Sequence, residues 1–200
     1  MSHHIYNTKG IVLSSFPIGE SDKLFKIFTR ELGLIDATAQ GVRKIESKNR
    51  YGLQDFSVSD ISLVRGREIW RITNVSSGEN IFSLLKNNRQ KLDSFSKIIL
   101  LVQRLVHGEE KNEELFDLLF EALNFLKNTD IGNQDYKNFD LIVSIKILNN
   151  LGYFDKNIQK DKLEIFLKKP IERSFLKEME EISFVAEQEI SKSLEETHLL

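Results

Sequence analysis

Positive charge is concentrated in the segment 42–52, which reads VRKIESKNRYG. It holds one anion, Glu46, and four cations: Arg43, Lys44, Lys48 and Arg50. Lys and Arg contact nucleic-acid phosphates without a fixed spacing, and the release of counterions supplies an affinity that falls as salt rises. Tyr51 adds an aromatic face at the end of the segment. The segment is therefore a candidate nucleic-acid contact, and a solvated surface loop is the alternative interpretation.

A second group of cations surrounds the single tryptophan of the chain. Arg65, Arg67 and Arg71 flank Trp70, and single-stranded nucleic acid is bound by such mixtures of cations and stacking rings. Trp70 and Arg71 are neighbours on an expected strand, so they point to opposite faces and only one of them can line a given groove. A place in the hydrophobic core is the other interpretation of Trp70, and it is the role more typical of tryptophan.

Catalytic and metal-binding patterns are not found in the sequence. The absence of cysteine excludes disulfides, thiolate metal sites and a cysteine nucleophile. The glycines form neither a G-x-G-x-x-G turn nor a phosphate-binding loop. No ligand spacing connects the four histidines, which are His3, His4, His107 and His198.

Pairs of adjacent glutamates are the remaining candidates for acid–base chemistry. They lie on or beside amphipathic patterns, so we interpret them as solvated helix faces. These pairs are Glu109-Glu110, Glu113-Glu114, Glu180-Glu181 and Glu195-Glu196. We therefore predict no catalytic residue, cofactor or metal, and an enzyme is the weaker class of function.

Charge and periodicity divide the chain into two expected domains, 1–80 and 81–200. The first carries 11 Lys and Arg against 9 Asp and Glu, and the second carries 17 against 21. Apolar residues alternate with polar ones up to about Ser77, whereas beyond Ile81 they recur every three or four positions.

With no membrane-spanning apolar run and no secretory signal pattern, we expect a cytoplasmic protein and no membrane contact.

The first domain is expected to form five strands. Gly33 supplies the positive φ that a hairpin between the second and third strands requires. A change of parity near Ser59 or Asp60 predicts a bulge in the fourth strand. Five strands in about 75 residues fit a Greek-key barrel of the oligonucleotide-binding (OB) type, and an SH3-like barrel fits almost as well. The strands are expected over 5–16, 23–29, 34–42, 55–64 and 68–75.

The second domain is expected to be all helical, which makes the fold class α+β. One helix stops near Gly108, another carries Leu115 to Leu126, and a last amphipathic helix carries Phe175 to Ile190. The segment Phe139 to Leu148 is apolar nearly all round, so we expect this helix to be central. Gly152 suits its C-terminal cap.

A series of short motifs over residues 8–75 resembles the RecO family of bacterial recombination mediators. Asp55 stands where that family usually has proline. The motifs, in order, are Thr8-Lys9-Gly10-Ile11-Val12-Leu13, Gly19-Glu20-Ser21-Asp22-Lys23-Leu24, Phe28-Thr29-Arg30-Glu31-Leu32-Gly33-Leu34, Ala39-Gln40-Gly41-Val42-Arg43-Lys44, Leu53-Gln54-Asp55-Phe56, Leu63-Val64-Arg65-Gly66-Arg67, Trp70 and Ile72-Thr73. Beyond residue 80 the resemblance rests on the helical pattern and on Phe139 through Tyr153. Many members of that family carry a cysteine-containing zinc module there. Because this chain has no cysteine, we expect no zinc and a shortened or rebuilt connection over 153–173. The chain also ends early for the family.

The resemblance implies an OB fold, a helical C-terminal domain, binding of single- and double-stranded DNA, and annealing of complementary strands. It also implies partnership with RecR and contact with single-strand-binding protein, so that RecA is loaded indirectly. Carried over by position, the expected DNA contacts are Arg30, Arg43, Lys44, Lys48, Arg50, Arg65, Arg67 and Arg71, with Tyr51 and Trp70 as stacking candidates.

Two other functions are compatible with the sequence. One is a protein-docking adaptor with negligible DNA affinity, which the overall charge of −2 permits. The other is a hydrolase that uses the glutamate pairs, which predicts metal-dependent cleavage of DNA.

Overall fold

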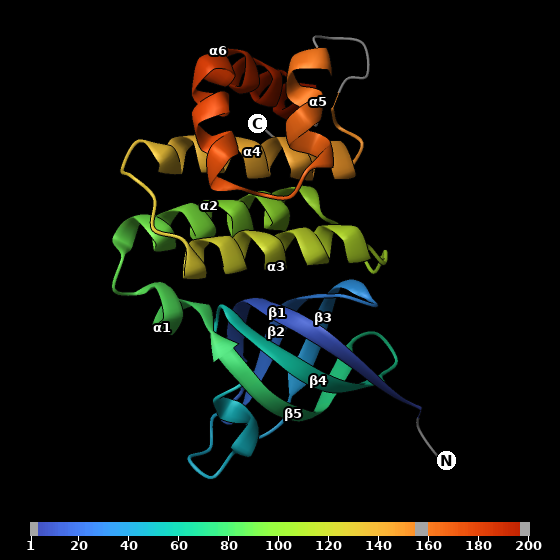
Figure 1. Cartoon of the computed structure of the whole chain (residues 1–200). Coiled ribbons are helices and arrows are strands. Elements are labelled where there is room, and N and C mark those ends of the chain that lie inside the picture. The colour runs from blue at the N-terminus through green and yellow to red at the C-terminus, as the bar shows by residue number, and fades with distance from the viewer. Residues whose placement is uncertain (1–3, 155–159, 197–200) are drawn as a thin grey trace. The chain divides into compact units, whose positions relative to one another are not determined.

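The computed structural model describes residues 4–154 and 160–196 of the chain (Figure 1). These residues form two compact units. The first comprises the chain up to Lys86 together with Val106–Phe116, and the second comprises Asn87–Leu105 and the chain from Asp117 onward. The predicted division at residue 80 stays a proposal. The units differ from it because residues 106–116 return to the first one.

The first unit is a closed five-stranded barrel with the strand order β1-β2-β3-β5-β4. Neighbouring strands are antiparallel except for β3 and β5, which pair in parallel through Ala37 with Trp70 and Thr38 with Arg71. The strands are β1 Ile5–Ile18, β2 Asp22–Thr29, β3 Gly33–Ala39, β4 Ser57–Arg65 and β5 Trp70–Asn80. The predicted fold class, an OB-like barrel followed by helices, is confirmed.

One turn of the barrel lies where the sequence pattern placed it, and one register shift lies beside the predicted position. The register of β4 against β5 shifts between Ser59 and Asp60, but Ser59 pairs with Gly78 and Asp60 with Ser76, so the extra residue is in β5. The bulge predicted in the fourth strand therefore lies in its partner strand. Gly33 has a φ of 70° and ends the turn between β2 and β3. The Thr29 hydroxyl accepts from the Leu32 backbone N–H at 3.1 Å and donates to the Gly33 carbonyl at 2.9 Å. Local sequence therefore determines this hairpin.

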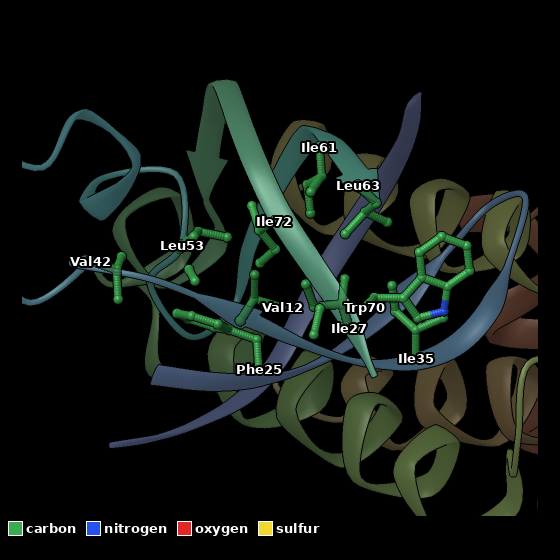
Figure 2. Packing of buried hydrophobic residues seen from close by; sticks show 12 residues of the cluster. Val12, Phe25, Ile27, Ile35, Val42, Leu53, Ile61, Leu63, Trp70 and Ile72 are labelled. Atoms are coloured by element: carbon green, nitrogen blue, oxygen red, sulfur yellow. The ribbon is translucent and has the colours of Figure 1, made fainter. Parts of the chain in front are cut away.

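The barrel interior is filled by apolar side chains from every strand and from the connection between β3 and β4 (Figure 2). Val42 and Leu53 of that connection are 4% and 2% exposed, and they lie near Phe25 at one end of the cluster. Trp70 lies at the other end, close to Ile35. The connection between β3 and β4 is thus attached to the barrel by two buried side chains.

The remainder of the first unit follows β5. Helix α1, Ile81–Leu85, begins at Asn80, whose side-chain oxygen accepts a hydrogen bond from the Ser83 N–H at 2.9 Å. The segment 106–116 contacts the turn between β2 and β3, since the Leu34 N–H donates to the Gly108 carbonyl at 3.1 Å. An alanine in place of Gly33 would bring its Cβ to 2.2 Å from the Glu110 carbonyl oxygen. This close approach adds a second reason for glycine at this position.

The second unit is helical. It contains α2 Arg89–Leu105, most of α3 Glu113–Asn128, α4 Asp135–Asn150, α5 Lys160–Lys168 and α6 Arg173–Glu196. Helix α4 is buried nearly all round and packs against α2, α5 and α6, as its apolar pattern predicts. Gly152, with a φ of 79°, follows its C-terminus as expected. The sequence analysis did not identify α1 or α5, and part of the connection expected over 153–173 lies outside the described residues.

Within the described ranges, we find no helix that combines the length and the apolar character needed to span a membrane.

Candidate nucleic-acid interface

The connection between β3 and β4, residues 40–56 and here called the basic loop, is held firmly at its start. The Asp22 carboxylate accepts a hydrogen bond from the Gly41 N–H at 2.8 Å, and the Arg43 N–H donates to the Ser21 carbonyl at 2.9 Å. The Gly41 bond, followed by one from the Ser21 hydroxyl, holds the pKa of Asp22 below its ordinary value. Desolvation opposes these two bonds with a smaller effect, and the charge of Lys44 adds the smallest lowering effect. The carboxylate is therefore ionised at neutral pH and fixes the loop to the start of β2.

The middle and end of the basic loop are also held. The Asn49 side-chain oxygen accepts from the Val75 N–H of β5 at 3.2 Å, and the Ser59 hydroxyl donates to the Gly52 carbonyl at 2.7 Å. A Cβ on Gly52 would lie 2.6 Å from Cγ1 of Val75, so only glycine permits this approach. Together with the two buried side chains, these contacts attach the loop to the barrel at its start, middle and end despite its polar composition.

The four predicted cations of the loop all point to solvent. Arg43, Lys44, Lys48 and Arg50 are exposed, and in the described part of the chain none of them forms an ion pair. The Arg43 guanidinium donates to the Gly19 carbonyl at 2.9 Å, which orients it without neutralising its charge. Lys48 and Arg50 lie on the short 3-10 helix η1, Lys48–Arg50. The structure therefore brings these four predicted contacts together on one loop of a rigid barrel.

Apolar surface accompanies these charges. Tyr51 is 73% exposed, so its ring is available to a base, as the stacking prediction requires. Ile45 is 85% exposed and was not singled out in the sequence, because one isoleucine among polar residues carries no pattern.

A pocket of about 290 Å³ opens beside the loop and is here called the barrel-end pocket. Its lining combines cations, an amide and apolar side chains: Lys23, Val42, Arg43, Arg50, Leu53 and Gln54. Lys23 of β2 was not predicted as a contact. Its position follows from the pairing of Lys23 with Ala39, which places it beside the strand end from which the loop departs.

The second predicted group, around Trp70, is arranged differently. Trp70 is 4% exposed, and the edge of the Tyr6 ring packs on it at a centroid distance of 5.1 Å. Arg65 lies over the indole ring, 4.8 Å from its centroid, and forms a salt bridge with Glu109. Trp70 therefore occupies the core, and a base would reach it only after Tyr6 and Arg65 had moved.

The other predicted cations are divided between paired and exposed positions. Arg30, in the turn after β2, is 3.1 Å from the Glu113 carboxylate and 4.0 Å from that of Glu31. Arg67 and Arg71 are exposed near the turn between β4 and β5. Because Trp70 lies at the end of the core opposite Val42 and Leu53 (Figure 2), the ten predicted residues do not form one continuous surface.

The glutamates of the segment 106–116 have a role that sequence reasoning missed. Glu109 and Glu113 were interpreted as solvated helix residues, but they form salt bridges with Arg65 and Arg30. These salt bridges connect residues that are far apart in the chain, so no local sequence pattern predicts them.

Metal-binding groups are not assembled in the part of the chain that the structure describes. No cluster of three or more His, Asp or Glu side chains capable of holding an ion occurs there. A thiolate zinc site does not fit a chain without cysteine.

Comparison with known families gives two consecutive matches. Residues 1–80 match the family described as Recombination protein O N terminal. Residues 90–154 match the family described as Recombination protein O C terminal. The first match covers the barrel and the basic loop, and the second covers α2, α3 and α4 except for the first residue of α2.

Individual relatives agree with these matches. A protein of Alkaliphilus metalliredigens is 32% identical over 127 residues, which cover 64% of this chain and 51% of the relative. A protein of Pelotomaculum thermopropionicum is 35% identical over 126 residues, which cover 63% of this chain and 49% of the relative. A protein of Mesoplasma florum is 29% identical over 153 residues, which cover 74% of this chain and 55% of the relative. Each is named DNA repair protein RecO, and the chain spans about half the length of the curated relatives it matches.

Proposed function

The chain belongs to the RecO family, and from this premise we propose that it is a DNA repair and recombination mediator that binds DNA through the basic loop. The observation that carries the proposal is the display of four exposed cations, without an ion pair among the described residues, on a loop fixed to a barrel. Phosphates of either single- or double-stranded DNA would be held by these charges, and the released counterions would supply the affinity.

The rest of the charge distribution supports localised binding. The chain carries a formal charge of −2, and residues 81–200 are acidic in balance. A polyanion is therefore repelled by much of the chain and attracted to the loop. Neutralising phosphates on two strands at once lowers their mutual repulsion, which is how we propose that annealing is promoted.

Protein partners complete the proposal. We propose that the chain acts with RecR and contacts single-strand-binding protein, and that RecA is thereby loaded on single strands in the cytoplasm. No bond is made or broken in this role, because exchange of coating proteins needs only a raised local concentration of DNA and partner. A pull-down with RecR and single-strand-binding protein from the same organism tests this step. Failure to retain either protein would limit the proposal to DNA binding.

Fluorescence anisotropy with a labelled 20-nucleotide single strand, measured over a range of salt concentrations, tests the DNA-binding step. Replacement of Arg43, Lys44, Lys48 and Arg50 by alanine should weaken binding and reduce the salt slope by about 0.7 for each lost phosphate contact, close to three in all. A control matched in the number of charges removes two arginines and two lysines that are exposed on helices of the second unit: Arg89, Lys137, Arg173 and Lys177. Two of these, Arg89 and Lys137, form salt bridges with Asp93 and Glu187, unlike the loop cations.

The outcomes separate the alternatives. An unchanged affinity and slope in the loop variant would refute the loop as the DNA site. Absence of any salt-dependent binding by the original protein would favour the docking adaptor. Cleavage of labelled strands in the presence of Mg²⁺ would favour the hydrolase, and intact strands would remove it.

A further inference from the structure

The barrel-end pocket has a chemistry that phosphate attraction alone does not need. Three of its lining side chains are cations, Lys23, Arg43 and Arg50, and its floor is formed by the buried Val42 and Leu53. Its volume of about 290 Å³ is at the lower limit of pockets that hold small ligands.

The cations of the pocket are available to an anion. Lys23 donates to the Ser15 hydroxyl at 3.1 Å, and Arg43 donates to the Gly19 carbonyl at 2.9 Å. Both partners are neutral, and no described carboxylate forms a salt bridge with these two side chains or with Arg50. Three positive charges around one hollow favour a phosphate group, and the arginines can bind it through two parallel hydrogen bonds.

The rest of the lining suits a nucleobase. Val42 and Leu53 offer an apolar contact to a flat ring, and Gln54 supplies an amide that can both donate and accept a hydrogen bond at its edge. The Gln54 side-chain oxygen accepts from Asn80 at 3.3 Å, which orients the amide. A bare inorganic anion would leave the apolar floor unused.

We propose that the barrel-end pocket binds one unstacked nucleotide of a single DNA strand, with its phosphate toward Arg43, Arg50 and Lys23 and its base against Val42 and Leu53. This inference rests on the proposed function, because it takes the basic loop as the place where DNA arrives. A paired and stacked base cannot enter a hollow of this size, so the pocket gives the protein a preference for single strands over duplex. Tyr51, next to Arg50 in the chain, is exposed for the neighbouring base.

The shape of the pocket is maintained by contacts within the protein. Its walls are fixed by the Asp22–Gly41, Asn49–Val75 and Ser59–Gly52 hydrogen bonds described above. A preformed site loses little conformational entropy when a nucleotide enters it.

The test fills the pocket without changing its charge. The variant Gln54→Trp places a bulky ring in the hollow, and Gln40→Trp is the matched control, because Gln40 is exposed on the same loop but does not line the pocket. Competition of 5′-dTMP and of inorganic phosphate against the labelled 20-nucleotide strand is measured for each protein, together with the ratio of single-strand to duplex affinity. Circular dichroism and thermal melting confirm that each variant is folded.

For the original protein and for Gln40→Trp, we expect 5′-dTMP to compete about tenfold better than phosphate, since a base contact adds to the phosphate contact. In Gln54→Trp this advantage should be lost, and the single-strand preference should fall about tenfold while the salt slope and the duplex affinity remain. A strand without bases cannot use the base contact of the pocket. Its affinity for the original protein should therefore equal its affinity for Gln54→Trp.

Two failures are distinguishable. Equal competition by nucleotide and phosphate, or an unchanged single-strand preference in Gln54→Trp, overturns the pocket while leaving the loop as a DNA site. If the fourfold loop variant described above binds the strand as well as the original protein does, the proposed function itself fails and the pocket proposal fails with it.

Discussion

The barrel unit carries arginines on two surfaces that look alike in the sequence and differ in the structure. Arg43 and Arg50 of the basic loop are exposed and form no salt bridge with a described residue. Arg30 and Arg65 contact the acidic segment 106–116 through Glu113 and Glu109. The comparison teaches that the availability of a cation depends on which distant segment returns to it, and not on its local sequence.

The basic loop also differs in how its shape is maintained. It is anchored by two apolar side chains, whereas the Arg30 and Arg65 surface is covered by charge pairs. Burial of a leucine is worth several times an exposed salt bridge, so the loop should tolerate salt much better than the paired surface does.

The largest effect is expected from removing an anchor of the loop. Leu53→Ala deletes a side chain that is 2% exposed and should lower the free energy of unfolding by about 3 kcal/mol, because a cavity remains. Urea denaturation measures this loss. DNA affinity should fall as well, since the cations on the loop lose their fixed positions. A loss below about 1 kcal/mol would mean that Leu53 does not hold the loop.

A smaller effect is expected when the paired surface is released. Glu109→Gln combined with Glu113→Gln removes the Glu109 partner of Arg65 and the Glu113 partner of Arg30, and should change the free energy of unfolding by about 1 kcal/mol or less, because both pairs are partly exposed. Arg65, which loses its salt bridge, should add to DNA binding and steepen the salt slope by up to about 0.7, whereas Arg30 keeps its contact with Glu31. An unchanged slope in the anisotropy experiment would show that this surface cannot meet the strand even when unpaired.

Much of the barrel was predictable because its determinants are local. Gly33 in the hairpin and the parity change at Ser59 both appear within a few residues. The structure confirms the positive φ of Gly33, and it shows a register shift beside Ser59 whose extra residue lies in β5 and not in β4. The apolar pattern of α4 likewise indicated its central position. The sequence pattern did not predict helices α1 and α5, because they have only 5 and 9 residues and their apolar periodicity is brief.

The site was only partly predictable because its determinants are not local. The charge of the basic loop is visible in the sequence, but the contribution of Lys23 to the pocket depends on strand register. The pairing of Arg65 with Glu109 joins residues 44 positions apart. Trp70 had two plausible roles, and only the packing of Tyr6 and Arg65 over its ring places it in the core.

The smallest expected effect concerns pH at the start of the loop. The pKa of Asp22 lies below its ordinary value of 3.8, mainly through the Gly41 hydrogen bond. The contribution of Asp22 is therefore fully present above the unfolded pKa and is lost as pH falls through the lower folded pKa. The Gly41 amide chemical shift should titrate with a midpoint below 3.8, and this step should disappear in Asp22→Asn. A midpoint above 3.8 would contradict the hydrogen bond.

The most direct test of the account removes two arginines from each surface in turn. Arg43→Gln with Arg50→Gln is compared with Arg30→Gln and Arg65→Gln by anisotropy with a labelled single strand over a range of salt concentrations. The account predicts that the loop pair weakens binding and lowers the salt slope by about 1.4, while the paired arginines change neither appreciably. An equal or larger loss from the Arg30 and Arg65 pair would contradict it.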